Sequence, residues 1–304
     1  MTTTAGPAAG MAGRTVPEPA RQVVGLLHPG EMGAFIGSAI QRAGHRVLWA
    51  GNDRSSASTE RAAGFEDAGD LASLVAAADS IVCVCPPAAA LEVARLVAAQ
   101  GFRGLYVDAN AIAPATVGAI AEVLDGAAVV DGGIIGGPST DDAVLHLAGP
   151  RAADALELFA PEALSVDVLD RPLGAASALK ACYAASSKAV TATLLSARAA
   201  AMASGVEEAL LAEWARTQPE VVDRSNSSLG RIHRKAWRFV GEMSEAADYF
   251  AATGVPDGFS RAATETFARL ADLRDAAAVA PHEVLERIAR GEPAPIARSG
   301  AGTA

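Results

Sequence analysis

A lysine within an apolar stretch is the first residue of this chain that could do chemistry. Lys180 lies in residues 173–205, where Ala, Ser, Thr and Leu dominate and the only other charged residues are Lys188 and Arg198. A lysine that is partly removed from water has a lowered pKa and can act as a general acid or base near neutral pH. Composition alone favours the simpler interpretation of a solvent-facing helical lysine.

A second candidate is the segment VVGLLHPGEMG, residues 23–33, where an apolar run leads into a glycine-punctuated turn and a helix. Loops of this kind hold the pyrophosphate of a dinucleotide at a helix N-terminus. Gly30 and Gly33 take two of the three glycine positions, and His28 replaces the first. Because Pro29 follows, we expect an extended His28, whose ring could add a hydrogen-bond donor. A plain strand-to-helix turn without a nucleotide is the alternative.

The choice of cofactor depends on the end of the second apolar run, LWAGNDRSSAST (48–59). Asp53 lies about 20 residues beyond the glycines, where an acidic side chain binds the ribose 2′-hydroxyl of NAD. Arg54, Ser55 and Ser56 could instead surround the 2′-phosphate of NADP. We favour NADP(H) over NAD(H).

These residues need a scaffold, and residues 21–171 alternate short β-rich runs with helical stretches. The expected strands are 22–27, 45–50, 80–85, 104–109, 127–134, 143–149 and 164–170. Apolar strands separated by helices of about 10–15 residues indicate a parallel sheet covered on both faces. The prediction is therefore an α/β fold, with a Rossmann-type doubly wound parallel sheet in the N-terminal part.

After residue 171 the strand pattern ends, and an all-helical domain is expected over 172–291. Its first stretch, 173–205, has no clean polar face, which predicts burial on all sides. Because the rest of the chain cannot cover it alone, we expect a homodimer through helix 173–204. Further helices are expected at 206–217, 219–229, 231–252, 259–275 and 282–290. Residues 1–20 and 292–304 have the composition of disordered segments.

Composition argues against several classes of protein. The chain has 304 residues and a net charge of −10, and it has no basic cluster interleaved with aromatic residues, which argues against a nucleic-acid partner. No apolar run reaches the roughly 18–20 residues of a membrane span. Cys83, Cys85 and Cys182 fit a reducing cytoplasm. No metal site is expected, because the cysteines and histidines lack ligand spacing.

Five blocks, in order, resemble the β-hydroxyacid dehydrogenase and 6-phosphogluconate dehydrogenase-like superfamily. They are VGLLHPGEMGAFIGSAIQRAGHRV (24–47), CVCPP (83–87), VDANAIAPAT (107–116), DGGIIGG (131–137) and GAASALKACYAA (174–185). The pattern looks most like the subgroup with a DUF1932-type C-terminal domain. The resemblance implies a 6-phosphogluconate dehydrogenase C-terminal-like helical domain and an NAD(P)-dependent oxidoreductase. Such an enzyme transfers hydride between nicotinamide and a small carbonyl or hydroxyl substrate.

The resemblance places the family's catalytic lysine at Lys180, as general acid or base in the cleft between the domains. With the loops above, the expected cofactor-binding residues are His28, Pro29, Gly30, Glu31, Met32, Gly33, Asp53, Arg54, Ser55, Cys85, Pro86 and Asn110. The expected substrate-binding residues are Ile135, Gly136, Gly137, Tyr183, Trp237 and Glu242.

Two positions depart from the family pattern. Ile135 replaces a serine that helps to bind a substrate carboxylate, and Glu242-Met243 lie where the family has a Lys-Asp pair. These departures keep two alternatives open, namely imine reductase-like C=N reduction on the same scaffold and a nucleotide-binding protein without catalysis. The presence of Lys180 favours C–O chemistry.

Several candidates also have a purely structural interpretation. Asn110 fits a turn residue bonded to its own backbone. Tyr183 and Trp237 fit core side chains, and Glu242 fits a solvated helix charge or a partner for a substrate amine. Lys188 lacks support from the family pattern, and we interpret it as structural.

Overall fold

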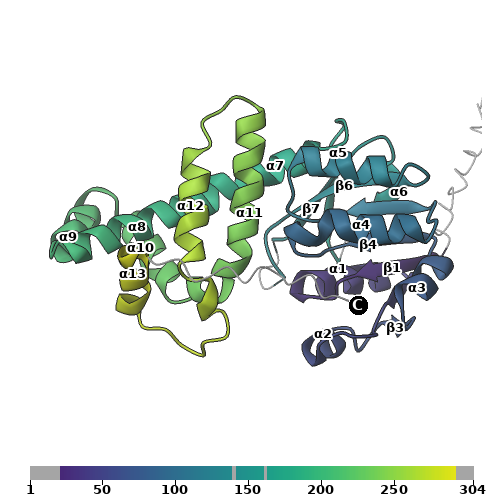
Figure 1. Ribbon diagram of the computed structural model, residues 1–304, viewed down its shortest axis with the longest axis horizontal. Helices are drawn as coiled ribbons and strands as arrows, with labels where there is room; N and C mark the ends of the chain where they lie inside the picture. The colour runs from purple at the N-terminus through teal and green to yellow at the C-terminus, as the bar shows by residue number, and fades with distance from the viewer. Residues whose placement is uncertain (1–20, 139–141, 161–162, 292–304) are drawn as a thin grey trace, which may run out of the picture.

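The computed structural model describes residues 21–138, 142–160 and 163–291, so the segments 1–20 and 292–304 lie outside the described residues. A sheet-containing half and a helical half are joined by one long helix (Figure 1). This order agrees with the predicted α/β fold followed by an all-helical region. None of the helices in the described part of the chain has the length and hydropathy that crossing a membrane requires.

Eight strands form a single sheet in the order β3-β2-β1-β4-β5-β6-β7-β8. They are β1 (Val23–Leu27), β2 (Arg46–Trp49), β3 (Glu66–Asp67), β4 (Ser80–Cys83), β5 (Leu105–Asp108), β6 (Ala128–Ile135), β7 (Val144–Ala148) and β8 (Ser165–Val168). Neighbouring strands are parallel except β6 and β7, which pair antiparallel. The prediction of an all-parallel sheet is corrected there, because parallel neighbours need a crossover of about a dozen residues and the connection is shorter.

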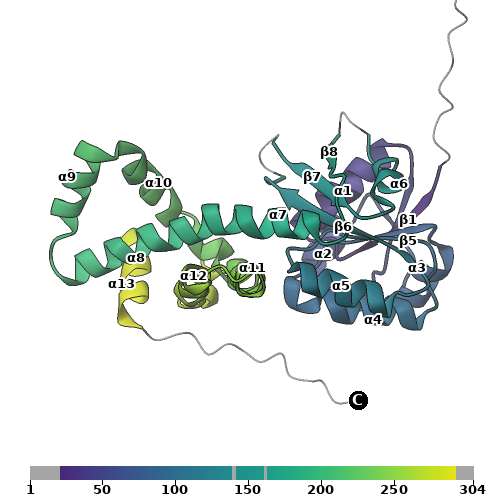
Figure 2. The ribbon, with the colours of Figure 1, turned by 90° about the horizontal axis from the view of Figure 1, so that it is seen from above.

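Helices cover both faces of the sheet, as a doubly wound fold requires (Figure 2). Helices α1 (Glu31–Arg42) and α6 (Ala152–Leu156) pack into the core on one face. Helices α3 (Leu71–Ala77), α4 (Ala90–Ala99) and α5 (Pro114–Val123) pack on the other, and the 3-10 turn η1 (Pro87–Ala89) precedes α4. The sequence did not predict helix α2 (Ser56–Arg61), which buries none of its residues and so has no apolar periodicity.

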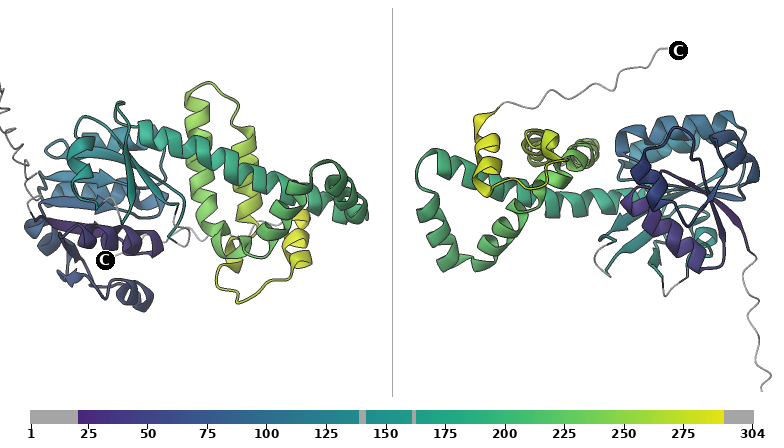
Figure 3. Two further views of the ribbon diagram at one scale, coloured as in Figure 1. Left: turned by 180° about the vertical axis from the view of Figure 1, so that it is seen from behind. Right: turned by 90° about the horizontal axis from the view of Figure 1, so that it is seen from below.

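The expected long helix is continuous, and it contains a π-helical turn. Helix α7 (Ala175–Ala184), the π turn η2 (Ala185–Ala189) and α8 (Val190–Ala203) run from the sheet to the far end of the molecule (Figure 3). One side of this helix packs in the core of the helical half. The expectation of burial on all sides does not hold within one chain, because Leu179, Tyr183 and Val190 are exposed.

The remaining helices form the body that packs on the long helix. They are α9 (Glu207–Thr217), α10 (Pro219–Leu229), α11 (Ile232–Ala252), α12 (Gly258–Ala268) and α13 (Pro281–Arg290). The helix expected at 259–275 ends at Ala268, and a 3-10 turn η3 (Ala271–Leu273) follows. Helix α11 is the element of this half that faces the sheet, since Gly241 lies against Pro87 of η1.

Candidate active site

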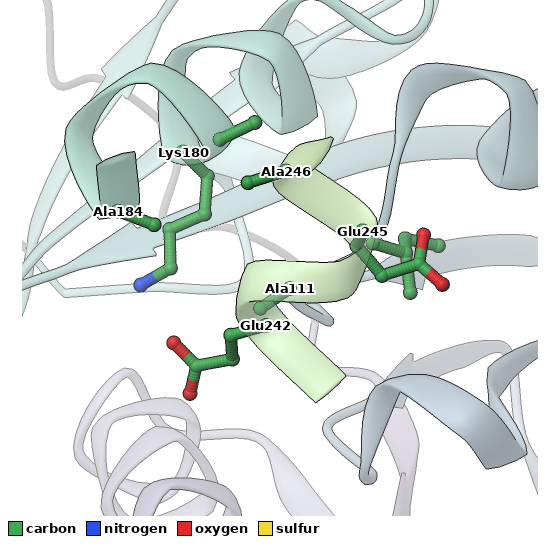
Figure 4. Close-up of a pocket in the computed structure, with 8 residues that line it drawn as sticks. Ala111, Lys180, Ala184, Glu242, Glu245 and Ala246 are labelled. Carbon is green, nitrogen blue, oxygen red and sulfur yellow. The ribbon is translucent and has the colours of Figure 1, made fainter. Parts of the chain in front are cut away.

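The candidate site lies at the carboxyl ends of β1, β4, β5 and β6. The strand order reverses its direction between β1 and β4, and open α/β sheets bind ligands in the crevice at such a point. The loops that follow these four strands carry most of the predicted site residues. Helices α7 and α11 bring Lys180 and Glu242 to the same region (Figure 4).

The loop after β1 contains one correction to the predicted geometry. His28 has a φ of +67°, in the left-handed region, and not the expected extended conformation. The N–H of Gly30 donates to the carbonyl oxygen of His28 at 2.8 Å, and this tight turn outweighs the preference that Pro29 imposes. His28 therefore adopts the conformation of the missing glycine, at a cost of about 1–2 kcal/mol.

The two retained glycines serve different purposes in this loop. A Cβ on Gly33 would collide with the carbonyl oxygen of His28, so Gly33 is needed for α1 to pack against the end of β1. A Cβ on Gly30 would meet no atom within 4 Å, because it faces open space at the N-terminus of α1. An open backbone surface at the positive end of a helix fits a dinucleotide pyrophosphate.

The loops after β1 and β2 lie close together. Burial, followed by the positive charge of Arg54, lowers the pKa of His28 below its usual value. Asp53 has a φ of +59°, and Ser55 caps α2 by accepting a hydrogen bond from the N–H of Ser58. In the loop after β2, Arg54 is thus the residue whose charge acts on His28 in the loop after β1.

Asn110 joins the ends of β4 and β5. Its Oδ1 accepts a hydrogen bond from the Cys85 N–H at 2.6 Å, and its Nδ2 donates to Oδ2 of Asp108 at 2.8 Å. Burial raises the pKa of Asp108 to about 7, while hydrogen bonds from Asn110 oppose that rise. Because both ends of its amide have protein partners, Asn110 shapes the loop that leads into the cavity beside Lys180. Pro86 follows Cys85 and is the N-cap residue of η1.

The start of α7 is fixed against β6. The Asp131 carboxylate accepts hydrogen bonds from the N–H of Ser177 at 2.9 Å and from its hydroxyl at 2.6 Å. A Cβ on Gly133 would come 2.6 Å from the carbonyl oxygen of Ala176, so glycine permits the close approach of helix and strand. Lys180 follows one turn later, and its Nζ donates to the carbonyl oxygen of Ile134.

Lys180 lines a cavity of about 10 Å³, which has room for about one water. The loop after β5 contributes Ala111 to its wall, and α11 contributes Glu242. Figure 4 shows the Lys180 amine and the Glu242 carboxylate directed to the same side, while the Glu245 carboxylate points away. The cavity is therefore a junction of the sheet, the long helix and α11.

The surroundings of Lys180 lower its pKa. Burial lowers its pKa, Glu242 raises it, and the cations Lys188 and Arg238 lower it, for a net value of about 8. Because Lys180 is part-buried and its Nζ donates to the carbonyl oxygen of Ile134, the interpretation as a solvent-facing lysine is wrong.

Glu242 lies among three cations. Its Oε2 is 2.8 Å from Nζ of Lys188, its Oε1 is 3.7 Å from Arg238, and the residue is only 8% exposed. Burial raises the pKa of Glu242, but Lys188, Lys180 and Arg238 outweigh it and hold the pKa below its usual value. Glu242 is thus an ionised buried carboxylate, which excludes a solvated helix charge.

The sequence did not identify Lys188 and Arg238 as parts of this cluster. Arg238 also approaches Glu31 of the glycine loop at 4.0 Å, which links α11 to the start of α1. The Arg238–Glu242 pair has the i,i+4 spacing of a helical ion pair and could have been found from the sequence. Lys188 gave no comparable signal.

The structure does not bring Tyr183 and Trp237 to the wall of this cavity. Tyr183 is 45% exposed on α7, and Trp237 is 38% exposed with Arg274 over its ring at 5.8 Å. Neither is therefore a core side chain.

The end of β6 carries the other predicted substrate residues. Ile135 is the last residue of the strand, and Gly136 has a φ of +91° in the turn that follows. A Cβ on Gly136 would lie 2.8 Å from Cα of Ala143, so the turn itself requires this glycine. Gly137 follows it. The described part of the chain contains no cluster of three or more His, Cys, Asp or Glu residues that could hold a metal ion.

Glu245 holds α11 against the sheet-containing half. Its Oε2 accepts hydrogen bonds from the N–H of Ala113 at 2.6 Å and from the hydroxyl of Thr116 at 3.2 Å, at the start of α5. A carboxylate in this position also interacts favourably with the helix dipole. The contact fixes the side of the cavity that faces the loop after β5.

Replacing Glu245 with alanine is expected to lower the free energy of unfolding by about 1.5–3 kcal/mol, because two hydrogen bonds to a charged acceptor are lost. Urea denaturation measures this change. Glu245→Gln keeps an acceptor oxygen and should lose less. Equal stability of the wild type and Glu245→Ala would contradict the assigned role.

The fold is similar to that of several solved structures. The structure resembles MTH1747, a conserved protein of unknown function whose structure was reported to resemble 3-hydroxyacid dehydrogenases (26% identity, TM-score 0.61, covering 83% of this chain and 98% of that one). It also resembles 3-hydroxyisobutyrate dehydrogenase from Mycobacterium tuberculosis (19% identity, TM-score 0.62, 88% and 98%). A third match is a reductive aminase from Aspergillus terreus in complex with NADPH (17% identity, TM-score 0.52, 90% and 100%). The chain therefore has the fold of the 3-hydroxyacid dehydrogenases.

Part of the helical half matches a known domain family. Residues 201–270 match the family described as a domain of unknown function, DUF1932. No curated protein matches the sequence. The fold and this domain together confirm the resemblance that the five sequence blocks predicted.

Proposed function

We propose that the protein is an NAD(P)-dependent oxidoreductase that transfers hydride between nicotinamide and a small carbonyl or hydroxyl substrate. The NAD(P)-binding domain would span residues 21–171, and the substrate and dimerisation domain 172–291. The observation that carries the proposal is the part-buried Lys180, which lines a cavity beside the carboxyl ends of β5 and β6, donates to the carbonyl oxygen of Ile134 and has a pKa lowered to about 8. An amine that exchanges protons near neutral pH suits the proton transfer that accompanies hydride transfer.

The residues of the chain divide this work between two places. The glycine loop, with Glu31, Met32 and Gly33 in the first turn of α1, would bind the pyrophosphate by backbone N–H groups. The nicotinamide, when bound, supplies or accepts the hydride. Lys180 would give a proton to the substrate oxygen during reduction and remove it during oxidation.

Arg54 supports the preference for NADP(H). It lies after β2 and acts electrostatically on His28, so it puts a positive charge beside the proposed dinucleotide site. A cation near this loop favours a 2′-phosphate, whereas an acidic residue favours a 2′-hydroxyl. In this proposal, Arg54 and Ser55 bind the 2′-phosphate of NADP, and Asp53, with its φ of +59°, forms the turn that precedes them.

We further propose a homodimer through helix 173–204 and a cytoplasmic location. The exposed apolar side chains Leu179, Tyr183 and Val190 along the long helix support the dimer, because a partner would bury them. The three cysteines of the described residues are free thiols, which suits a reducing compartment.

The pH dependence of turnover tests this function. NADPH consumption is followed with aldehydes, ketones and oxo acids, and NADP⁺ reduction with the corresponding alcohols. Because Lys180 must be protonated to act as an acid, kcat/KM for reduction is expected to be flat below about pH 8 and to fall above it. Oxidation needs the neutral amine, so its rate should rise through the same pH.

Two other outcomes would replace this proposal. Reduction of cyclic imines without any turnover of carbonyls or alcohols would identify C=N chemistry on the same scaffold. Binding of NADPH with no turnover of any compound would indicate a nucleotide-binding protein without catalysis.

A further inference from the structure

Lys188 is a buried cation beside the site to which the proposed reaction gives no task. Its side chain is 15% exposed, its Nζ is 2.8 Å from Oε2 of Glu242, and it lies over the ring of Phe239 at 5.2 Å from the centroid. Ion pairs removed from water are weak sources of stability, because desolvation of both charges offsets their attraction. Stability alone therefore gives little reason to keep a charged pair here.

The π turn explains how Lys188 reaches Glu242, which lines the cavity. In an α-helix of about 3.6 residues per turn, residues eight positions apart point about 80° away from each other. The turn Ala185–Ala189 is π-helical, with more residues per turn, so each residue rotates less about the axis. Lys188 lies within this turn and is rotated back toward the face of Lys180. Single π turns of this kind are frequent at functional sites.

We propose that Lys188 and Glu242 are positioning residues for Lys180: the π turn brings Lys188 to Glu242 on the cavity wall, and this ion pair sets the electric field at the Lys180 amine. This inference deepens the proposed function and rests on it for the task of Lys180. The two members of the pair act in opposite directions. Lys188 disfavours the ammonium form of Lys180 by like-charge repulsion, and Glu242 favours it by attraction.

Other charged groups on the packed elements have partners of their own. Glu245 of α11 is bonded to Ala113 and Thr116, Asp131 of β6 to Ser177, and His146 of β7 to Asp167, while Glu122 of α5 is exposed. Besides Lys188, Arg238 is the cation that acts on Lys180, and it divides its contacts between Glu242 and Glu31. Lys188 and Glu242 are therefore the pair to vary.

The sequence makes a direct measurement practical, because the chain contains only three lysines, Lys180, Lys188 and Lys235. The experiment titrates the full-length protein, labelled with ¹³C at lysine Cε, by NMR without substrate or cofactor. The variants are Lys188→Met, Glu242→Gln and the double variant, with Lys188→Arg as the charge-conserving variant. Lys235→Met is the matched control, because Lys235 is exposed on α11.

The wild-type Lys180 resonance is expected to titrate near pH 8. Lys188→Met should raise the pKa of Lys180 and Glu242→Gln should lower it, each by at least about 0.5 pH unit. The double variant should return toward the wild-type value, and Lys188→Arg and Lys235→Met should leave it unchanged. A purely structural pair would not shift the titration in opposite directions.

Shifts in the same direction, or none, would overturn the inference. If one single variant does not fold, the other and the double variant still provide the comparison, because removing both charges leaves no unpaired ion. The titration needs no turnover, so its result is separate from the proposed function. If the pKa of Lys180 shifts in opposite directions in a protein that has no activity, the role of the ion pair is supported and the oxidoreductase proposal is rejected. If the protein is active but the pKa of Lys180 does not shift, the oxidoreductase proposal is supported and the role of the ion pair is rejected.

Discussion

Replacing Lys180 with methionine is expected to lower kcat by about 10²–10⁴-fold, the contribution typical of a general acid or base. Methionine keeps most of the buried aliphatic volume and removes the amine that donates to the carbonyl oxygen of Ile134. The affinity for NADPH should stay unchanged, since Lys180 lies on α7 and the glycine loop lies after β1. Steady-state kinetics and calorimetric titration with NADPH measure the two quantities.

Lys235→Met is the control for this change, because it removes an exposed lysine from the same half of the molecule. It should retain wild-type turnover. A loss of less than about tenfold in Lys180→Met would remove Lys180 from the acid–base role. A large loss of NADPH affinity would instead assign the lysine to cofactor binding.

Gly30→Ala is expected to weaken NADPH binding by at least about tenfold, or roughly 1.4 kcal/mol, without lowering the melting temperature. The added methyl group meets no protein atom within 4 Å, and the φ of −72° at Gly30 suits alanine. The space that the methyl group fills is the space that the pyrophosphate needs. This variant should therefore lose affinity for NADPH and keep the melting temperature of the wild type.

Gly33→Ala is the matched variant, and its expected effect is on folding. Its Cβ would collide with the carbonyl oxygen of His28, so α1 has to move away from the loop. Overpacking of this kind costs about 1–3 kcal/mol and should lower the melting temperature. If Gly30→Ala binds NADPH as the wild type does, no phosphate approaches the Gly30 backbone, and the proposal that this loop binds the pyrophosphate is wrong.

The sequence predicted most of the fold because its apolar runs and helical periods are strong. Seven strands were expected, and each is present in the sheet. The eighth strand, β3, was not predicted, because it is only two residues long and both residues are exposed, so no hydrophobic pattern marks it. The antiparallel pairing of β6 with β7 depended on the length of their connection and could have been read from the sequence.

The site was predictable only in part. The predictions for Lys180, Gly30 and Gly33 rest on neighbours that carry a recognisable motif, and their roles stay predictions. The left-handed His28 was missed, because the preference of Pro29 for the preceding residue was weighed without the hydrogen bond that closes the turn. Lys188 was interpreted as structural because the family pattern does not support it. On a regular α-helix its i,i+8 spacing would also direct it about 80° away from Lys180, whereas the chain has a π turn there.

The most direct test of the central claim compares NADPH consumption by the wild type and by Lys180→Met, side by side, on one panel of aldehydes, ketones and cyclic imines. We predict that the wild type consumes NADPH with at least one carbonyl compound, and that Lys180→Met binds NADPH equally well but loses about 99% or more of that rate. Equal rates in the two proteins, or NADPH binding without consumption by the wild type, would contradict the account.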